Sequence, residues 1–304
     1  MAAAQMAAAS PYTGRKPVVD RMLAMMREAK ARGADVIVYP ELALTPFFIM
    51  HWVDDLAEAD VYYEKAMPNP DVQPLFDEAR ALGIGFYLGY AELIGQGEGA
   101  KRFNTAILVG KTGEIIGKYR KVHLPGHADY RPELPFQGLE KLYFEVGDTG
   151  FGTWQAFGGV VGMCICNDRR WPETYRVMGL QGVELVMVGY NTPTSVPWDT
   201  TFDHLTEFHN HLSVQAGAYQ NSSWVVSVAK TGRDGPLDLI GGSCIVSPGG
   251  EIVMTAQTRE DELLVAACDL DLAQKYKRSV FDFSQHRRTE HYRAICDQIG
   301  VAAA

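Results

Sequence analysis

Segments with helical spacing of apolar residues alternate with short runs of β-branched residues along the chain. From Pro17 to Arg32 apolar side chains recur at helical spacing, and Gly33 is placed to end that helix. The run Val36–Val38 then reads as a buried strand that ends at Pro40. Further helices are expected over 72–82, 171–181 and 203–220, and further strands over 84–90, 160–166, 183–189, 224–229 and 263–270. This alternation predicts an α/β protein.

Two hairpins close two similar halves of the chain. GKTG (110–113) and PGG (248–250) are turn segments, and each lies between two short strands. Two pairs of passages are alike: AILVGKTGEII (106–116) with CIVSPGGEIV (244–253), and RGADVIVY (32–39) with QGVELVMV (181–188). A duplicated unit of this kind predicts two sheets packed face to face with helices outside. Because no low-complexity linker separates the halves, we expect a single domain over residues 1–304.

Composition narrows the class of protein. The 304 residues include 28 Lys and Arg against 37 Asp and Glu, which gives a formal net charge of −9 and a pI near 5.4. Because no run of basic residues occurs, neither nucleic acid nor a membrane is expected as a partner. The opening MAAAQMAAAS lacks the charged start of a secretory signal, no apolar stretch approaches the ~20 residues of a membrane helix, and five scattered cysteines make no disulfide framework. We therefore expect a soluble, cytoplasmic protein.

Three residues stand where a buried strand ends, a position from which a rigid scaffold presents side chains to a site. The first, Glu41, follows VIVYP, where partial desolvation suits a general base; a helix-capping or loop glutamate is the alternative. The second, Lys121, ends GKYRK, in which strand alternation places Tyr119 and Lys121 on one face and Arg120 on the other. A solvated basic edge is the alternative for this segment.

Cys166 is the third of these residues. It closes VVGMCIC at a strand-to-helix turn, where a helix N-terminus would stabilise a thiolate. The alternative is a buried strand cysteine, which is the interpretation preferred for Cys164. A zinc site is not indicated, because no second cysteine pair has the required spacing. The histidines His204, His209 and His211 also lack a metal-binding spacing and are expected at the surface or in support of other residues.

Together, PELALT around Glu41, GKYRKVHLPG around Lys121 and CICNDRRWPE around Cys166 resemble the Glu-Lys-Cys triad of the nitrilase superfamily of carbon–nitrogen hydrolases. The resemblance runs from about residue 15 to about residue 295 and implies that superfamily's four-layer α-β-β-α sandwich. Longer strings are similar to its D-carbamoylase branch: LTPFF (44–48), MPNPDVQPLF (67–76), KRFNTAILV (101–109), CNDRRWPE (166–173), GYNTPT (189–194), HLTEFHNHLSVQAGAYQN (204–221) and FDFSQHR (281–287).

The resemblance implies hydrolysis of N-carbamoyl-D-amino acids to D-amino acid, carbon dioxide and ammonia, with no metal or other cofactor. Cys166 would attack the carbamoyl carbon, and Glu41 would carry the proton between the thiol, the departing nitrogen and water. Lys121 would stabilise the developing oxyanion. Glu140 matches a second acidic position beside the triad and would orient Lys121 or the attacking water; a charged loop residue is the alternative.

A carbamoyl amino acid also carries a carboxylate, so its site requires a cation. Arg169 and Arg170 follow the nucleophile and suit bidentate carboxylate recognition, with Arg170 favoured. A surface ion-pair cluster with Asp168 and Glu173 is the alternative. The resemblance adds three further candidates for substrate binding: Asn167, Thr192 and His123.

Two places depart from the D-carbamoylase pattern. Ala7, Ala8 and Ala9 stand where the family has larger β-branched residues, and the loop through Thr13 is short, so the first strand is expected to be a weak edge. Gly138 stands where a bulkier polar side chain is expected, which predicts a roomier pocket.

Other activities fit parts of the pattern. A β-ureidopropionase or an aliphatic amidase would keep the triad, and an amidase would have less need for paired arginines. A catalytically silent binding module would be expected to lose a triad residue, and a metal-dependent amidohydrolase would require a metal. The expected partners are a small carbamoyl amino acid and further copies of the chain, as a homodimer or homotetramer. The resemblance makes residues 281–304 the oligomerisation tail, whose apolar positions include Phe281, Phe283, Tyr292 and Ile295.

Overall fold

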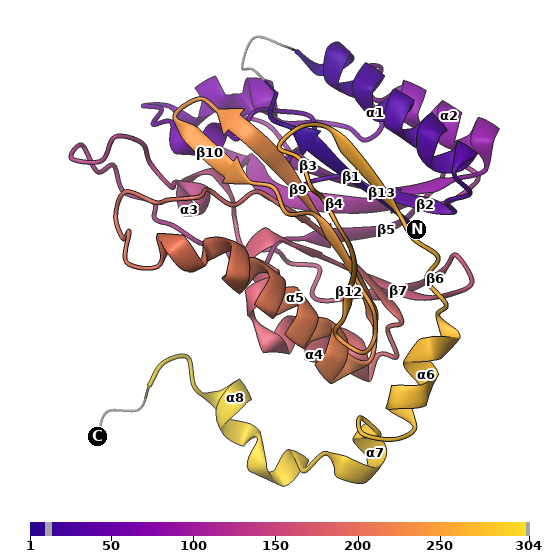
Figure 1. The fold of residues 1–304 in the computed structure, drawn as a ribbon. Helices are drawn as coiled ribbons and strands as arrows, with labels where there is room; N and C mark the ends of the chain where they lie inside the picture. Colours follow the sequence, from indigo (N-terminus) through magenta and orange to yellow (C-terminus); the bar gives the residue numbers. More distant parts are fainter. Residues whose placement is uncertain (10–13, 302–304) are drawn as a thin grey trace.

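The computed structural model describes residues 1–9 and 14–301, and its strands form two sheets that lie face to face (Figure 1). The first half of the chain supplies β1 (Ala2–Ala7), α1 (Arg15–Ala31), β2 (Val36–Val38), α2 (Gln73–Leu82), β3 (Gly85–Ile94), β4 (Lys101–Val109) and β5 (Ile115–Arg120). The second half supplies α3 (Glu140–Tyr143), β6 (Thr153–Ala156), β7 (Gly159–Ile165), α4 (Pro172–Leu180), β8 (Leu185–Tyr190), α5 (Thr206–Asn221), β9 (Trp224–Asp234), β10 (Leu237–Ile240), β11 (Cys244–Val246), β12 (Ile252–Thr255) and β13 (Glu262–Val265). The tail carries α6 (Asp271–Lys277), α7 (Phe283–His286) and α8 (Arg293–Asp297). Short 3₁₀ helices lie in the connections: η1 (Phe48–Met50), η2 (Leu56–Tyr62), η3 (Gly97–Gly99), η4 (Cys166–Arg170), η5 (Asp203–Leu205) and η6 (Thr289–His291).

The strand order places three parallel strand ends together. The path runs β5-β4-β3-β2-β1-β9-β8-β7-β6, with β10 and β11 beside β9, β12 beside β11 and β13 beside β1. Within it, β2 pairs in parallel with β3, and β8 pairs in parallel with both β7 and β9. Because ligands in α/β proteins bind at the carboxyl ends of such strands, the ends of β2, β7 and β8 mark the place for a site.

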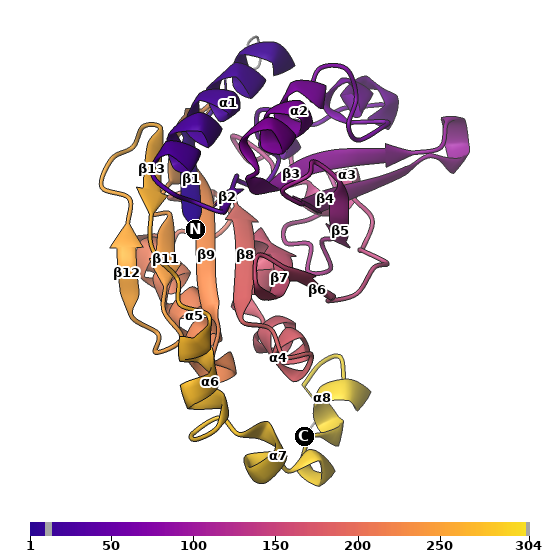
Figure 2. The ribbon, with the colours of Figure 1, turned by 90° about the vertical axis from the view of Figure 1, so that its right-hand side faces the viewer.

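Helices cover the outer face of each sheet, as Figure 2 shows. On one side, α1 and α2 bury Met22 and Phe76 against the sheet of β1 to β3. On the other side, α4 and α5 bury Met178 and Val214 against β7, β8 and β9. The predicted four-layer α-β-β-α sandwich is therefore confirmed.

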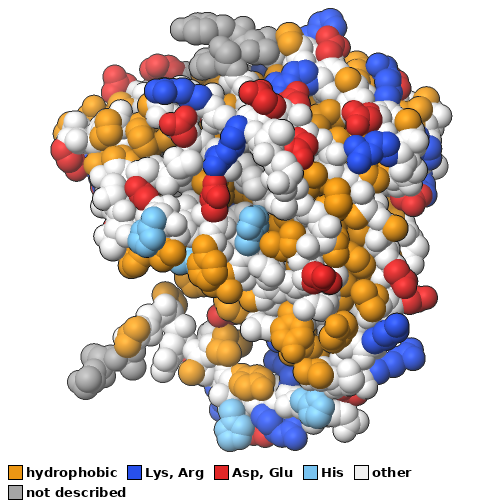
Figure 3. Space-filling view, in the orientation of Figure 1, with side chains coloured by type: hydrophobic (Ala, Val, Ile, Leu, Met, Phe, Trp, Pro, Cys, Tyr) orange, Lys and Arg blue, Asp and Glu red, His pale blue; other side chains and the backbone are white. Residues whose placement is uncertain are grey.

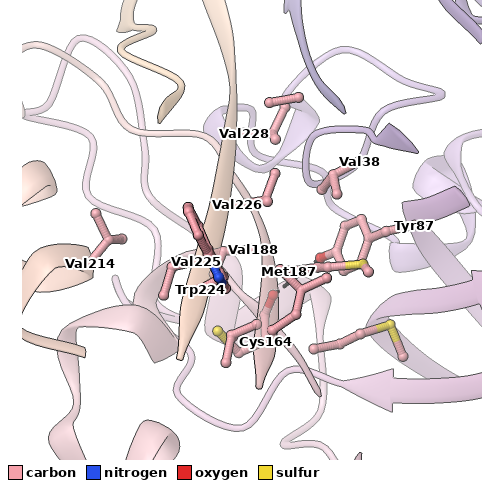
Figure 4. Close-up of a cluster of buried hydrophobic side chains, with 14 of the residues drawn as sticks. Val38, Tyr87, Cys164, Met187, Val188, Val214, Trp224, Val225, Val226 and Val228 are labelled. Atoms are coloured by element: carbon pink, nitrogen blue, oxygen red, sulfur yellow. Dashed lines mark hydrogen bonds between the residues drawn. The ribbon is translucent and has the colours of Figure 1, made fainter. Parts of the chain in front are cut away.

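The two sheets meet in a buried layer of apolar side chains. In Figure 4, Val38 and Tyr87 of the first sheet point toward Met187 of the second. The Tyr87 hydroxyl also crosses this layer, since it donates to the carbonyl of Cys164 at 3.2 Å and accepts from the amide of Gly189 at 3.2 Å. Cys164 belongs to the core, as the sequence suggested, and the sheets are held in register by polar as well as apolar contacts.

The alanine-rich first strand is not an edge, which corrects the sequence prediction. Its start, at Ala2 and Ala3, pairs with β2 and β13, whereas Met6 and Ala7 pair with β9, so β1 joins the two sheets. Ala2, Ala3 and Ala4 are wholly buried, with the two sheets' cores on either side. Small side chains suit a strand that is covered on both faces, where larger ones would be overpacked. The loop through Thr13 lies outside the described residues.

Most predicted segments are found with shifted ends. Both hairpins are present, as antiparallel β4–β5 and β11–β12. The helix predicted over 203–220 is divided, because η5 precedes α5, which begins at Thr206. The last strand ends at Val265 instead of continuing to residue 270. Its partner β1 begins at Ala2, which pairs with Val265, and the amide of Ala266 donates to the carbonyl of Met1, so no β1 residue remains for the positions that follow.

The C-terminal tail runs past the ends of α4 and α5 (Figures 1 and 2). Phe281 packs edge-on against Tyr219 with ring centroids 4.9 Å apart, and the Arg176 guanidinium lies 4.2 Å above the Phe283 ring. Farther along, Ile295 is exposed. Hydrophobic side chains gather where the tail meets the body in Figure 3. Across residues 1–9 and 14–301, no helix combines the length and apolar character that a membrane crossing requires.

Candidate active site

A sharp turn after β7 presents Cys166. The residue adopts φ 48°, in the left-handed region, and it is 7% exposed at the start of η4. The buried Asp168 carboxylate fixes this turn, because it accepts hydrogen bonds from the amide of Ile165 at 3.0 Å and from the Tyr119 hydroxyl at 2.7 Å. A strained backbone that its neighbours hold in place is a common device for exposing a nucleophile.

The Cys166 thiol holds its proton more tightly than an ordinary cysteine. Burial raises the pKa of Cys166 and the Glu41 carboxylate raises it further, while Lys121 and Arg169 lower it. This is opposite to the thiolate expected from a helix N-terminus, because η4 is too short for its dipole to outweigh desolvation. The thiol donates to the carbonyl of Asn191 at 3.4 Å. A base is therefore needed to activate it.

Glu41 is the residue that the sequence predicts as this base. It lies beyond the end of β2 with no exposed surface, and its carboxylate accepts from the amide of Asn191 at 2.9 Å and from the side-chain amide of Asn104 at 2.7 Å. Two glycines allow this approach: a Cβ on Gly189 would lie 2.5 Å from the Glu41 nitrogen, and one on Gly89 2.8 Å from its Cα. The Glu41 backbone therefore lies in close contact with strands of both sheets, β3 and β8.

Lys121 points inward, as strand alternation predicted. Its Nζ lies 2.8 Å from Oε1 of Glu41 and also bonds Oε1 of Glu140, whereas Arg120 pairs with Glu92 and Asp148 on the other face. Burial alone would lower the pKa of Lys121, but the charges of Cys166, Glu140 and Glu41 together raise it well above its usual value. The ammonium is therefore a fixed positive charge in a water-poor site.

Glu140 completes the cluster from the first turn of α3. Burial raises the pKa of Glu140 to about 7 and nearby Glu41 adds to the shift, against the lowering effect of Lys121. The side-chain amide of Asn104 donates to Oε1 of Glu41 and, at 3.0 Å, to Oε1 of Glu140. Asn104 thus bridges both carboxylates.

A cavity of about 280 Å³ opens above Cys166. Beside Cys166, four of the predicted residues line it: Glu140, Asn167, Arg169 and Thr192. Arg170 lines it too; its side chain is exposed and makes no hydrogen bond or ion pair with any residue that the structure describes. The predicted extra room at Gly138 is absent, because the indole of Trp198 occupies the space above that glycine.

Arg169 has a different environment from Arg170. It is 1% exposed, and its guanidinium donates to the Cys166 carbonyl at 2.6 Å, to Oδ1 of Asn210 at 3.0 Å and to Oγ1 of Thr192 at 3.0 Å. It also lies 4.3 Å above the Tyr190 ring. These contacts occupy all three of its nitrogens, so Arg169 holds the turn that carries the nucleophile.

His123 does not line the cavity, contrary to the sequence prediction. Its ring stacks on Trp171 at 5.0 Å and Phe151 at 5.8 Å, and its Nδ1 lies 2.9 Å from Oδ1 of Asp168. It therefore supports the Asp168 carboxylate from behind the site. The histidines of the α5 region also lie outside the cavity: His204 is exposed, His209 is half-buried, and Nε2 of His211 lies 3.1 Å from the carbonyl of Gly242.

Sequence reasoning missed Asn104, Asn191 and Trp198. Asn104 had a detectable signal, since it is a polar residue within the otherwise apolar strand FNTAILV. Asn191 lies in GYNTPT, a string that carries the family resemblance, but only Thr192 was selected from it; Trp198 had no signal, because SVPW reads as ordinary loop sequence.

Comparisons with known proteins place the chain in a family and agree with its fold. The family model described as carbon–nitrogen hydrolase matches residues 1–278. The chain is 29% identical to the N-carbamoylputrescine amidase of Arabidopsis thaliana over 290 residues, covering 91% of this chain and 89% of that protein. It is 30% identical to a nitrilase of Pyrococcus abyssi over 272 residues, covering 88% and 90%. A carbon–nitrogen hydrolase structure from Helicobacter pylori G27 superposes with a TM-score of 0.82 at 21% identity, covering 98% and 97%. With its buried cysteine, glutamate and lysine gathered at strand ends in the sandwich, the chain belongs to the carbon–nitrogen hydrolase family.

Proposed function

We propose that this carbon–nitrogen hydrolase cleaves N-carbamoyl-D-amino acids to D-amino acid, carbon dioxide and ammonia. The observation that carries the proposal is Arg170, a guanidinium without a protein partner among the described residues, on the wall of the cavity that holds Cys166. A guanidinium binds a carboxylate through two parallel hydrogen bonds, and an unpaired one in a cavity favours an anionic ligand. Carbamoyl amino acids supply both the carbonyl carbon and the carboxylate, whereas carbamoyl amines and aliphatic amides lack the carboxylate.

The first step is attack by sulfur. Because the Cys166 pKa is raised, the thiol is protonated near neutral pH and must lose its proton as the S–C bond forms. Glu41 accepts this proton, and Asn191, which contacts both groups, keeps their relative positions. The carbonyl π electrons move to oxygen and give a tetrahedral oxyanion.

Lys121 stabilises that oxyanion. An ammonium has three N–H bonds, and Lys121 directs two of them to Glu41 and Glu140. The third remains for the substrate oxygen. Loss of one such donor costs about 3–4 kcal/mol of transition-state stabilisation in comparable sites.

Collapse of the oxyanion breaks the C–N bond and leaves a carbamoyl group on sulfur. Glu41 returns its proton to the departing nitrogen and then takes one from water, whose oxygen attacks the S-linked carbonyl carbon. Cys166 leaves as thiolate and recovers a proton from Glu41, and the released carbamic acid decomposes to carbon dioxide and ammonia. Glu140, charged and bonded to Lys121, holds the ammonium in place through both stages.

A carbamoyl amine is the second candidate substrate. The likeness to an N-carbamoylputrescine amidase supports it, and Asp203, a half-buried carboxylate on the cavity lining, offers a partner for a cationic amine. Arg170 opposes it, because a second cation in the same cavity is repelled. The two candidates therefore differ in which of these charges the substrate uses.

Ammonia release separates these possibilities. We expect turnover of N-carbamoyl-D-phenylalanine and N-carbamoyl-D-alanine, with much less of the L-enantiomers, N-carbamoyl-β-alanine, N-carbamoylputrescine and an aliphatic amide. Arg170→Ala should raise KM for the carbamoyl amino acid by about tenfold or more, which corresponds to loss of a charged hydrogen bond. Arg278→Ala, at an exposed arginine outside the cavity, is the matched control. Preferred turnover of N-carbamoylputrescine, or equal effects of both variants, would contradict the proposal.

A further inference from the structure

Gly138 and Trp198 are in direct contact on the cavity lining. A Cβ built on Gly138 would lie 2.5 Å from Cη2 of Trp198 and 3.2 Å from both Cζ2 and Cζ3. The nearest atoms to that Cβ thus all belong to the indole, and Gly138 has no left-handed φ that would itself require glycine. A side chain at position 138 would therefore meet the Trp198 indole first, and one of the two would have to shift.

The glycine side of this contact is held in place. The amide of His127 donates to the carbonyl of Gly138 at 2.9 Å, and the amide of Gly138 donates to Nε2 of His127 at 3.2 Å. The other ring nitrogen of His127 bonds the carbonyl of Asp129 at 2.8 Å. A Cβ on Gly126 would meet the Gly138 carbonyl at 2.0 Å, so the two chain segments lie as close as glycine permits.

Two aromatic rings pack against the Trp198 indole beside Gly138. The His127 ring meets Trp198 edge to face, with centroids 5.7 Å apart at 85°, and Phe136 meets it with centroids 6.5 Å apart at 71°. Such edge-to-face arrangements are the favourable ones for aromatic pairs. Trp198 nevertheless stays 38% exposed, so part of its surface is free to meet a ligand.

The cavity lining has an apolar part beside its polar part. Its apolar side chains come from several loops and strands: Phe47, Ile49, Pro125, Phe136, Val196, Trp198 and Leu237. A carbamoyl amino acid with its carbonyl carbon at Cys166 and its carboxylate at Arg170 has one remaining group, the amino-acid side chain. Because burial of apolar surface is favourable, an apolar side chain gains most from this part of the lining.

We propose that Trp198, seated on Gly138, is the specificity-determining wall of the side-chain subsite and selects carbamoyl amino acids with large apolar or aromatic side chains. This rests on the proposed function, since it assumes a carbamoyl amino acid. The absence of a side chain at position 138 lets the outer edge of the indole, at Cη2, approach the glycine and leaves the exposed part of the ring for the substrate. Gly138 and Trp198 then act as one unit, and their substitutions are coupled.

The test compares kcat/KM for N-carbamoyl-D-phenylalanine and N-carbamoyl-D-alanine in a double-mutant cycle. Trp198→Ala should lower the Phe-to-Ala ratio by about tenfold or more, a size typical of changed pocket contacts. Gly138→Val should also lower the ratio, because its methyl groups displace the indole. In the Trp198→Ala background, Gly138→Val should change the ratio far less, because the colliding ring is gone. Trp52→Ala, at a tryptophan with the same 38% exposure but outside the cavity, should leave the ratio unchanged.

Each outcome decides the inference. An unchanged ratio in Trp198→Ala, or purely additive effects of the two substitutions, would overturn it while wild-type turnover of N-carbamoyl-D-alanine still supports the proposed function. Absence of wild-type turnover on both substrates would remove the proposed function and this inference with it. Circular-dichroism melting of each variant separates a loss of folding from a change of selectivity, and Gly138→Ala, a smaller intrusion, provides the second measurement should the valine variant fail to fold.

Discussion

Asn191 holds Glu41 at two points, with its backbone amide 2.9 Å from Oε2 and its side-chain amide 3.0 Å from the Glu41 carbonyl. Asn191 follows β8 of one sheet and Glu41 lies beyond β2 of the other, so these bonds join the sheets at the candidate site. The Asn191 carbonyl also accepts from the Cys166 thiol at 3.4 Å. The proposed nucleophile and the proposed base are therefore both held by one residue that the triad motif does not contain.

Gly189→Ala should damage the site through the backbone. The new Cβ would lie 2.5 Å from the Glu41 nitrogen, and two packed strands have little freedom to separate. We expect a loss of about 1–3 kcal/mol in the free energy of unfolding, the usual cost of overpacking, together with a fall in kcat. Urea unfolding and steady-state kinetics measure both. Gly99→Ala, where a Cβ meets nothing within 4 Å, is the control, and equal behaviour of the two variants would disprove the close approach.

Cys166→Ala should abolish turnover without unfolding the protein. Removal of a nucleophile that acts with its base typically costs about 10⁴-fold or more in kcat, while loss of one small side chain leaves the sandwich intact. Iodoacetamide should inactivate the wild type, with substrate protecting Cys166 in peptide mass spectra. Cys296→Ala, at an exposed cysteine in the tail, should keep full activity. Inactivation with label only on Cys244, Cys268 or Cys296 would argue against the mechanism.

Activity should rise with pH through the titration of Glu140. Burial raises the pKa of Glu140 to about 7, and its ionised form binds the Lys121 ammonium more strongly than its protonated form. We expect kcat/KM to increase from about pH 6 to about pH 8 and expect Glu140→Gln, which cannot ionise, to lose this limb. An identical profile in the variant would assign the limb to another group.

The same shift predicts how stability changes with pH. The folded state binds the Glu140 proton more tightly than the unfolded state, whose pKa is near 4.5. The contribution of Glu140 to the free energy of unfolding is therefore most favourable below the unfolded pKa and falls as pH rises to about 7. Relative to the wild type, Glu140→Gln should become more stable over that window. Denaturant unfolding of both proteins at several pH values checks the sign.

We propose that the chain associates with copies of itself through α5 and the C-terminal tail. Phe208 and Leu212 on α5 and Ile295 in the tail are large apolar side chains that the single chain leaves exposed. Light scattering should give a mass of at least twice the 33.6 kDa of one chain. Leu212→Arg combined with Ile295→Glu should reduce it to the monomer, whereas Val61→Glu, at an exposed residue on η2, should not. A wild-type monomer would refute the proposal.

Much of the fold and the three central residues follow from sequence. Helices and strands are encoded by local periodicity, and Val36–Val38 is found as predicted. Glu41, Lys121 and Cys166 each stand where a strand runs out, a position that sequence order reveals. The weak-edge prediction for β1 was wrong because strand neighbours depend on long-range pairing, and alanine alone does not distinguish an edge from a tightly covered centre.

The sequence by itself determined the order of elements and the places of Glu41, Lys121 and Cys166 after strands, because these depend on neighbouring residues and spacing. Only the tertiary structure decided that the Cys166 pKa is raised, that Arg169 supports the turn while Arg170 faces the cavity, and that Trp198 fills the space above Gly138. Desolvation, hydrogen-bond satisfaction and steric contact are sums over side chains that lie far apart in the chain. Their outcome is set when the two sheets and their loops come together.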